Sequence, residues 1–277
     1  MSLLSESAEK AYGPAFTTKA SAVAGRLGVD RDWLLGAISM ETGGFSVSGP
    51  PWKKRNPKDH GGGLIGFTRD DGGAWEHKGP VDQLDDVEAY FRAKMRLLDV
   101  TTFRSPAEFY MLVRGPSGLL MGPAAPMGAG VTKQQVVDII NTYFSRHGLT
   151  WTLPNVGVEG SWTAKIGSWT GRFVFDTQGS MWWAALPQRG PGSVDPTGRF
   201  GASAEREVPY AARTYGRWEC AAGKVRWRFW PQTDIRRFEI LLPVSSGKAE
   251  GRILPAGQGT FQMWRGAREP RLQPHQP

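Results

Sequence analysis

Apolar residues in the first half of the chain recur at intervals of three and four positions, the spacing of one face of an α-helix. Asp30 stands where a helix N-cap would stand, and glycines at 43 and 44 allow a left-handed helix end. A polar, glycine-rich segment follows over residues 43–80, and segments this long within a compact domain are usually functional. The pattern predicts helices over residues 17–27, 30–41, 82–98, 105–114 and 133–146. In the last of these, the residues expected to face the core are Val136, Ile139, Ile140 and either Tyr143 or Phe144.

Beyond residue 150 the pattern changes to short stretches rich in β-branched and aromatic residues, which are typical of strands. In one of them Arg226 and Arg228 alternate with hydrophobic residues, so one face is expected to be solvated and the other buried. A segment rich in proline and glycine over residues 187–209 is expected to form a long exposed loop. The predicted strands cover residues 161–166, 171–176, 224–230 and 238–242.

The distribution of tryptophan supports two domains of different class. Of the twelve tryptophans, three precede residue 150 and nine follow it. We therefore predict an α+β multidomain protein, with an all-α domain over residues 1–150 and an all-β barrel or sandwich over residues 151–267. Tryptophans at alternating strand positions are expected to be core residues rather than sugar-stacking ones. The polar, proline-rich stretch 268–277 is expected to be a disordered tail.

Composition narrows the classes of partner. A formal net charge of +8 over 277 residues favours acidic partners such as nucleic acid, anionic lipid or bacterial wall polymers. A single cysteine and four scattered histidines exclude a disulfide framework and a multi-cysteine zinc site, so we expect neither a metal nor a cofactor. No apolar run reaches the roughly 18 residues needed to span a membrane, and the N-terminus lacks a signal-peptide pattern. We expect synthesis in the cytoplasm and no membrane insertion.

The residue with the strongest chemical signal is Glu41. Leu34, Ile38 and Glu41 fall at i, i+4 and i+7, which places this carboxylate on the apolar face of its predicted helix. Desolvation and the negative end of the helix dipole both disfavour the ionised form, which suits a group that donates a proton. The alternative is that Glu41 turns out to solvent past the last turn, as most glutamates at helix ends do.

Four short motifs, taken in order, resemble the lysozyme-like, soluble lytic transglycosylase superfamily. They are most similar to the versions found in phage tail and endolysin-type muramidases, and the resemblance covers roughly residues 15–145. The order of motifs, rather than any one of them, carries the resemblance. The motifs occupy residues 38–46, 56–57, 63–68 and 82–91.

The resemblance implies cleavage of peptidoglycan at the β-1,4 bond after N-acetylmuramic acid, with Glu41 at the catalytic position. The family usually has Gln where this chain has Gly66, and it has an Asn-Ala-Tyr motif that is absent here; Tyr110 is the nearest candidate for the aromatic residue of that motif. Loss of the glutamine side chain is expected to weaken or retune sugar binding. The implied substrate-binding residues are Thr42, Gly63, Leu64, Ile65, Phe67 and Tyr110.

The mechanism depends on whether a second carboxylate takes part. Glycosidases that hydrolyse their substrate normally use two carboxylates. The resemblance to lytic transglycosylases implies a mechanism in which one glutamate acts alone and an anhydro product forms. Asp59, Asp70 and Asp71 could supply a second acid, but their glycine-rich surroundings are typical of solvated turns. We favour a site in which Glu41 acts without a second acid, and hydrolysis remains the alternative to the anhydro-forming reaction.

The leading hypothesis is therefore a muramidase or lytic transglycosylase that acts as an antibacterial effector or a phage-type lysin. The second predicted domain has a repeated Gly-x-Trp spacing, as in residues 160–162, and in this it is similar to β-rich modules appended to bacterial toxin-like enzymes. The expected partners are peptidoglycan and an immunity or secretion-apparatus protein, and the chain would reach the wall by a separate delivery route.

The alternative is a catalytically decayed glycan-binding or structural protein. Nucleic-acid binding ranks last, because strict alternation puts Arg226 and Trp227 on opposite faces.

Overall fold

The computed structural model divides the chain into two compact units. The helical unit comprises residues 1–119 and 123–152, and the barrel unit comprises residues 120–122 and 153–277. One unit is built from helices and the other from antiparallel strands, so the chain has the predicted α+β architecture in two parts. The structure describes residues 2–45, 62–67, 74–149, 151, 156–166, 169–176, 179–185, 214–229, 237–242, 244, 247–254 and 259–265.

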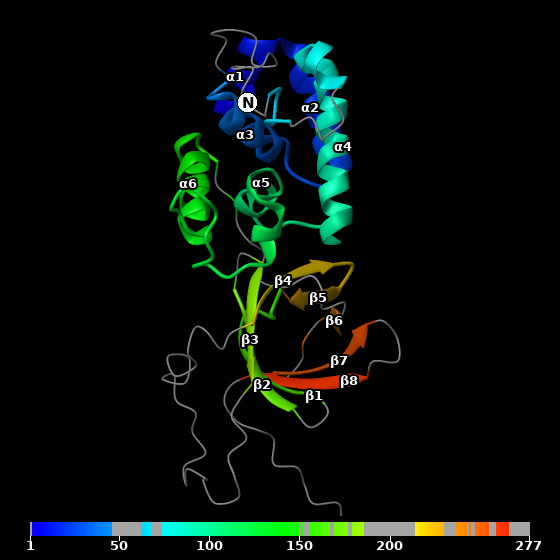
Figure 1. The fold of residues 1–277 in the computed structure, drawn as a ribbon. Helices are drawn as coiled ribbons and strands as arrows, with labels where there is room; N and C mark the ends of the chain where they lie inside the picture. The colour runs from blue at the N-terminus through cyan, green and yellow to red at the C-terminus, as the bar shows by residue number, and fades with distance from the viewer. Residues whose placement is uncertain are drawn as a thin grey trace, which may run out of the picture. The chain divides into compact units, whose positions relative to one another are not determined.

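The helical unit contains every helix that the periodicity predicts and one that it does not (Figure 1). The additional helix, α1, is capped by the Ser2 side chain, and its apolar buried residues are only Leu4 and Ala8, a pattern too sparse to show as a stripe. Among the described helices, none has both the length and the apolar composition needed to cross a membrane. The helices are α1 (Leu3–Tyr12), α2 (Pro14–Leu27), α3 (Arg31–Thr42), α4 (Pro80–Leu98), α5 (Pro106–Arg114) and α6 (Lys133–Arg146), with short 3-10 turns η2 (Ala74–His77) and η3 (Pro116–Leu120).

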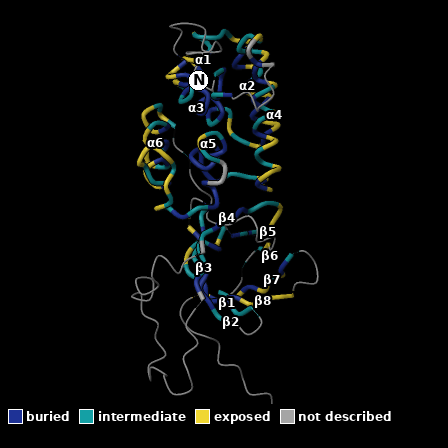
Figure 2. Tube along the Cα trace, in the orientation of Figure 1, coloured by how far each residue is buried: buried dark blue, intermediate teal, exposed yellow. Residues whose placement is uncertain are grey.

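Most residues of helix α3 are buried (Figure 2). It contacts α1, α2 and α5, and the side chains of Leu34, Leu35 and Ile38 are fully buried. A Cβ added at Gly36 would lie 2.3 Å from the Phe144 ring of α6, so the absence of a side chain lets these two helices approach. Burial on several sides fixes the rotation of α3 about its axis.

Helix α6 differs from its prediction at one position. Val136, Ile140 and Phe144 are buried at intervals of four residues, as expected. Ile139 is 56% exposed, so the prediction that it faces the core is wrong. The buried stripe of this helix follows the i, i+4, i+8 row, which leaves position 139 outside it.

The barrel unit is a closed barrel in which each strand pairs antiparallel with the next and β8 pairs with β1. Its interior is filled by aromatic side chains, including Trp162, Trp218 and Trp227, which are at most 2% exposed. The prediction that strand tryptophans belong to the core is confirmed for these three residues. The predicted loop over 187–209 and the predicted tail lie outside the described residues. The strands are β1 (Gly160–Ile166), β2 (Trp169–Phe175), β3 (Ser180–Ala185), β4 (Thr214–Ala221), β5 (Lys224–Phe229), β6 (Arg237–Leu241), β7 (Lys248–Leu254) and β8 (Thr260–Arg265).

The close approach of α3 and α6 generates a stability prediction. Gly36→Ala should lower the free energy of unfolding of the helical unit by about 1–3 kcal/mol, because the new methyl group meets the buried Phe144 ring. Gly25→Ala is the matched control: this glycine of α2 has no neighbour within 4 Å of an added Cβ, and the change should raise stability by about 0.5–1 kcal/mol. Chemical denaturation of both variants measures the difference, and equal effects would contradict the packing described.

Candidate active site

Glu41 occupies the last turn of α3. The helix begins after Asp30, whose side chain accepts a hydrogen bond of 2.7 Å from the backbone N–H of Asp32, and it ends at Gly43, where φ is 69°. Leu34 and Ile38, on the same face, are fully buried, whereas Glu41 is half-buried. The helix thus holds a partly accessible carboxylate at the edge of its apolar face.

One oxygen of this carboxylate is held by a tyrosine from α5. The Tyr110 hydroxyl donates a hydrogen bond of 2.5 Å to Glu41 Oε1, and the Tyr110 side chain is buried. Burial raises the pKa of the Tyr110 phenol, and the negative charge of Glu41 and the hydrogen bond to it raise it further. Tyr110 therefore remains a hydrogen-bond donor at neutral pH, and it fixes the orientation of Glu41.

The other oxygen, Oε2, lies beside a tight turn over residues 62–67. The ends of the turn exchange two backbone hydrogen bonds, Gly62 N to Phe67 O at 2.9 Å and Phe67 N to Gly62 O at 2.6 Å. Within it Gly66 has a φ of 68°, and a Cβ added there would lie 3.1 Å from Glu41 Oε2. A glutamine, which the resemblance leads one to expect at this position, would be strained in this backbone conformation and would crowd the carboxylate.

Gln83 on α4 holds the turn in place. Its Oε1 accepts a hydrogen bond of 3.1 Å from the backbone N–H of Leu64, while its Nε2 donates to the carbonyl oxygens of Trp75 and Lys78 at 3.0 and 3.2 Å. The side chain is fully buried, so these bonds are shielded from water. The buried ring of Phe67 stacks on Trp75 with centroids 5.7 Å apart, which anchors the end of the turn.

The remaining predicted substrate contacts have buried side chains. Leu64, Ile65 and Phe67 are at most 2% exposed, and Gly63 is also buried. The Thr42 hydroxyl donates to the Ile38 carbonyl at 2.8 Å and accepts from the Phe45 N–H at 3.2 Å, so it stabilises the helix end. The role of these residues in substrate binding stays a prediction.

Three further residues contribute to the site although the sequence pattern did not single out their roles. Arg114 lies one turn beyond Tyr110 on α5, is exposed, and acts electrostatically on the Tyr110 phenol, lowering its pKa against the larger raising effects. Ser39 bonds Tyr143 of α6 through a hydroxyl pair 2.6 Å apart, which ties α6 to the turn of α3 that carries the carboxylate. Only the i+4 spacing of Tyr110 and Arg114 is visible in the sequence.

The three carboxylates considered as a second acid, Asp59, Asp70 and Asp71, lie outside the described residues. Glu108, two positions before Tyr110, is buried and accepts a 2.6 Å hydrogen bond from the backbone N–H of Arg104, so it stabilises the start of α5. Within the part of the chain that the structure describes, no three or more His, Cys, Asp or Glu side chains gather as they would around a metal ion.

The contact between Glu41 and Tyr110 predicts a coupled titration. Glu41→Gln removes a negative charge and a charged hydrogen-bond acceptor, so the pKa of Tyr110 should fall toward the ordinary tyrosine value of about 10. NMR of ring-labelled tyrosine over an alkaline titration would measure the change. Glu6→Gln, which removes an exposed carboxylate from α1, should leave Tyr110 unchanged. An identical Tyr110 titration in the wild type and in Glu41→Gln would exclude the contact.

A comparison with models of known protein families finds no match, and neither the curated proteins nor the solved structures yield one. The chemistry of this chain must therefore be inferred from its own residues. Those residues bring one half-buried carboxylate, one constrained tyrosine and one glycine of a tight turn to a single point.

Proposed function

We propose that the helical unit cleaves peptidoglycan glycan strands at the β-1,4 bond after N-acetylmuramic acid, as a lytic transglycosylase or lysozyme-type muramidase. The observation that carries this proposal is the position of Glu41, between the Tyr110 hydroxyl on one side and the Gly66 backbone on the other. A carboxylate held in this way is oriented before substrate arrives, which is what a general acid requires. The order of motifs that resembles the lysozyme-like superfamily adds to the same proposal.

The two oxygens of Glu41 then have different roles. Oε1 accepts the hydrogen bond from Tyr110, so Oε2, beside Gly66, is the oxygen that carries the proton to the leaving glycosidic oxygen. Proton transfer requires a separation of about 2.6–3.2 Å, and the absence of a side chain at Gly66 leaves the approach to Oε2 uncrowded from the turn. As the bond between C1 and the leaving oxygen breaks, positive charge develops on the sugar, and the carboxylate left after proton transfer stabilises it.

The second step follows from the use of one carboxylate. Glu41, now ionised, takes the proton of the muramoyl 6-hydroxyl, and that oxygen forms a new bond to C1. The product is an anhydro sugar, the glutamate is protonated again, and no water is consumed. Hydrolysis would instead require Glu41 or a second acid to activate water.

The charges near the site suit an anionic substrate. Arg114 presents an exposed guanidinium one turn beyond Tyr110, and guanidinium groups bind carboxylates through two parallel hydrogen bonds. Peptidoglycan carries carboxylates on the peptide stems that begin at each muramic acid, which distinguishes it from neutral glycans. We therefore favour peptidoglycan over an uncharged polysaccharide as the substrate.

This function implies a place of action and further partners, which we propose with it. The chain would act on the bacterial wall, in the periplasm of a target or host cell, as an antibacterial effector or phage-type lysin. A protein that carries a wall-degrading activity into a competitor needs a delivery route, and its producer needs protection. A secretion-apparatus protein or an immunity protein is therefore the expected protein partner.

One observation favours a second candidate function. Gly66 cannot supply the hydrogen bonds that a glutamine side chain would give to a sugar. A protein that kept the fold and lost this contact could bind glycan strands without cleaving them. Cleavage of purified sacculi separates this decayed glycan-binding protein from the enzyme.

The proposed catalytic role predicts a large and specific loss of activity. Glu41→Gln should lower release of muropeptides from purified sacculi by about a hundredfold or more, because an amide cannot donate the proton. Glu6→Gln, which also removes one carboxylate, should retain wild-type activity. Mass spectrometry of the products should show anhydro ends.

Other outcomes of the same assay are equally informative. Reducing ends would identify hydrolysis instead of the single-carboxylate route. Full activity in Glu41→Gln would remove Glu41 from the mechanism. A wild-type protein that binds sacculi but releases no muropeptides at any pH would favour the decayed glycan-binding protein.

A further inference from the structure

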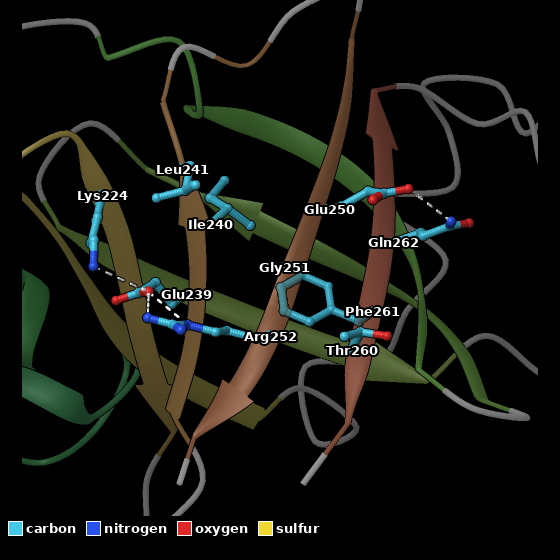
Figure 3. A pocket seen from close by; sticks show the side chains of 10 residues that line it. All are labelled: Lys224, Glu239, Ile240, Leu241, Glu250, Gly251, Arg252, Thr260, Phe261 and Gln262. Carbon is cyan, nitrogen blue, oxygen red and sulfur yellow. Dashed lines mark hydrogen bonds and ion pairs between the residues drawn. The ribbon is translucent and has the colours of Figure 1, made fainter. Parts of the chain in front are cut away.

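The outer face of strands β5, β6 and β7 carries a group of cations arranged around one buried carboxylate (Figure 3). Arg226, Glu239 and Arg252 are directly opposite one another on the three strands. Arg226 Nε lies 2.7 Å from Glu239 Oε2, Arg252 Nε and Nη2 lie 2.9 and 2.5 Å from Oε1, and Lys224 Nζ lies 3.6 Å from Oε1. The register of the sheet therefore brings three cationic groups to one point.

The carboxylate and the cations differ in exposure. The Glu239 side chain is 2% exposed, whereas those of Lys224, Arg226 and Arg252 are 33%, 43% and 58% exposed. Burial tends to raise the pKa of Glu239, but hydrogen bonds from Arg226 and Arg252 outweigh it and the pKa is lowered, so the group is ionised at neutral pH. Counting Glu250, an exposed carboxylate that lines the same face, three positive charges against two negative charges leave an excess of one positive charge, and the cations remain accessible to solvent.

A hollow of about 510 Å³ lies against this group. Lys224 lies at one end, Arg252 and Thr260 are directly opposite each other on β7 and β8, and the other end is lined by Gln262, whose amide donates a 3.1 Å hydrogen bond to Glu250 (Figure 3). The volume falls within the range of sites that bind small ligands or short peptide segments. The cations thus suit a carboxylate, and Thr260 and Gln262 offer the hydroxyl and amide groups that pair with peptide bonds.

We propose that this face of the barrel unit binds the acidic peptide stems of peptidoglycan. The inference deepens the proposed function, on which it rests, because it names the part of the wall polymer that the barrel unit holds. Lys224 and Arg252 contact the stem carboxylates, while Gln262 and Thr260 hydrogen-bond the peptide backbone. A second contact with the wall keeps the helical unit near its substrate and raises its effective concentration there.

The arrangement of aromatic side chains argues against nucleic acid as the ligand. Single-stranded nucleic acid is bound by exposed aromatic rings interleaved with cations. In β5 the cations face outward, whereas Trp227 and Phe229 belong to the buried core of the barrel. Phe261, which lines the hollow, is 2% exposed and covers Gly251. The described part of this face offers carboxylate recognition without a base-stacking surface.

Binding to purified sacculi tests the proposal, with the full chain carrying Glu41→Gln so that cleavage does not interfere. Adding Arg252→Gln should weaken binding about fivefold, as expected for one partly exposed charge pair. The matched control is Lys248→Gln, which removes a cation from the same outward face of β7 at a position outside the hollow, and should leave binding unchanged. Lys224→Gln is a second variant that spares both arginine pairs, so it tests the site if Arg252→Gln lowers the melting temperature.

Two further arms identify the ligand. Glycan strands that an amidase has freed of their peptide stems should bind the Glu41→Gln protein no more tightly than the Arg252→Gln variant binds intact sacculi. The proposal is overturned if stem removal has no effect, if Arg252→Gln and Lys224→Gln behave like Lys248→Gln, or if a single-stranded oligonucleotide competes better than a free stem peptide. Stem-dependent binding with no muropeptide release by the wild type would overturn the proposed cleavage alone.

Discussion

The burial of helix α3 is the constraint on which the site depends. Its side chains contact α1, α2 and α5, and Gly36 admits the Phe144 ring of α6, so α3 can neither rotate nor slide without opening the core. A buried helix fixes the direction of every side chain it carries, including one at its last turn. The left-handed end at Gly43 then stops the helix directly after Glu41 and Thr42. The carboxylate is in this way positioned by apolar packing rather than by other charged groups.

Two segments that are distant from Glu41 in the sequence lie beside it in the structure. Tyr110 approaches from α5, and the turn over 62–67 approaches because buried Gln83 holds the backbone of Leu64. The hydrogen bond from Tyr110 orients Oε1, and the turn lies beside Oε2, an arrangement that orients the carboxylate in advance. In the barrel unit, too, a carboxylate is held in position by the surrounding backbone. There the sheet register holds Glu239 under its cations, which keeps their charges together on the outer face.

The sequence predicted these features to different degrees. Helices with a regular apolar stripe, such as α4, and strands with clean alternation, such as β5, could be read directly because burial on one face imposes the period. Helix α1 was missed because it buries only two apolar residues, too few to show as a stripe. Ile139 was misplaced because it stands next to Ile140, which belongs to the buried stripe of α6. Strands β3, β4, β7 and β8 were not predicted either. In β7, Gly251 stands at an inward position that the Phe261 ring fills, so the pattern has a gap.

The same reasoning applies to the site. The position of Glu41 follows from spacing within one helix, whereas Tyr110 was named only as the nearest candidate for the aromatic residue of a motif that this chain lacks. The approach of Gly66 to Glu41 Oε2 and the hydrogen bond between Gln83 and Leu64 join separate segments of the chain, and no local pattern records them. The absence of a glutamine at Gly66 looked like a loss in the sequence. In the structure a glycine is what the backbone conformation and the nearby carboxylate require.

The most direct measurement of the central claim is a crystal structure of the Glu41→Gln protein with a bound peptidoglycan glycan fragment. The account predicts that the side-chain amide introduced at position 41 lies about 2.6–3.2 Å from the glycosidic oxygen that follows N-acetylmuramic acid. Tyr110 should remain bonded to the opposite side of that amide. A fragment bound with all its glycosidic oxygens away from position 41 would contradict the account.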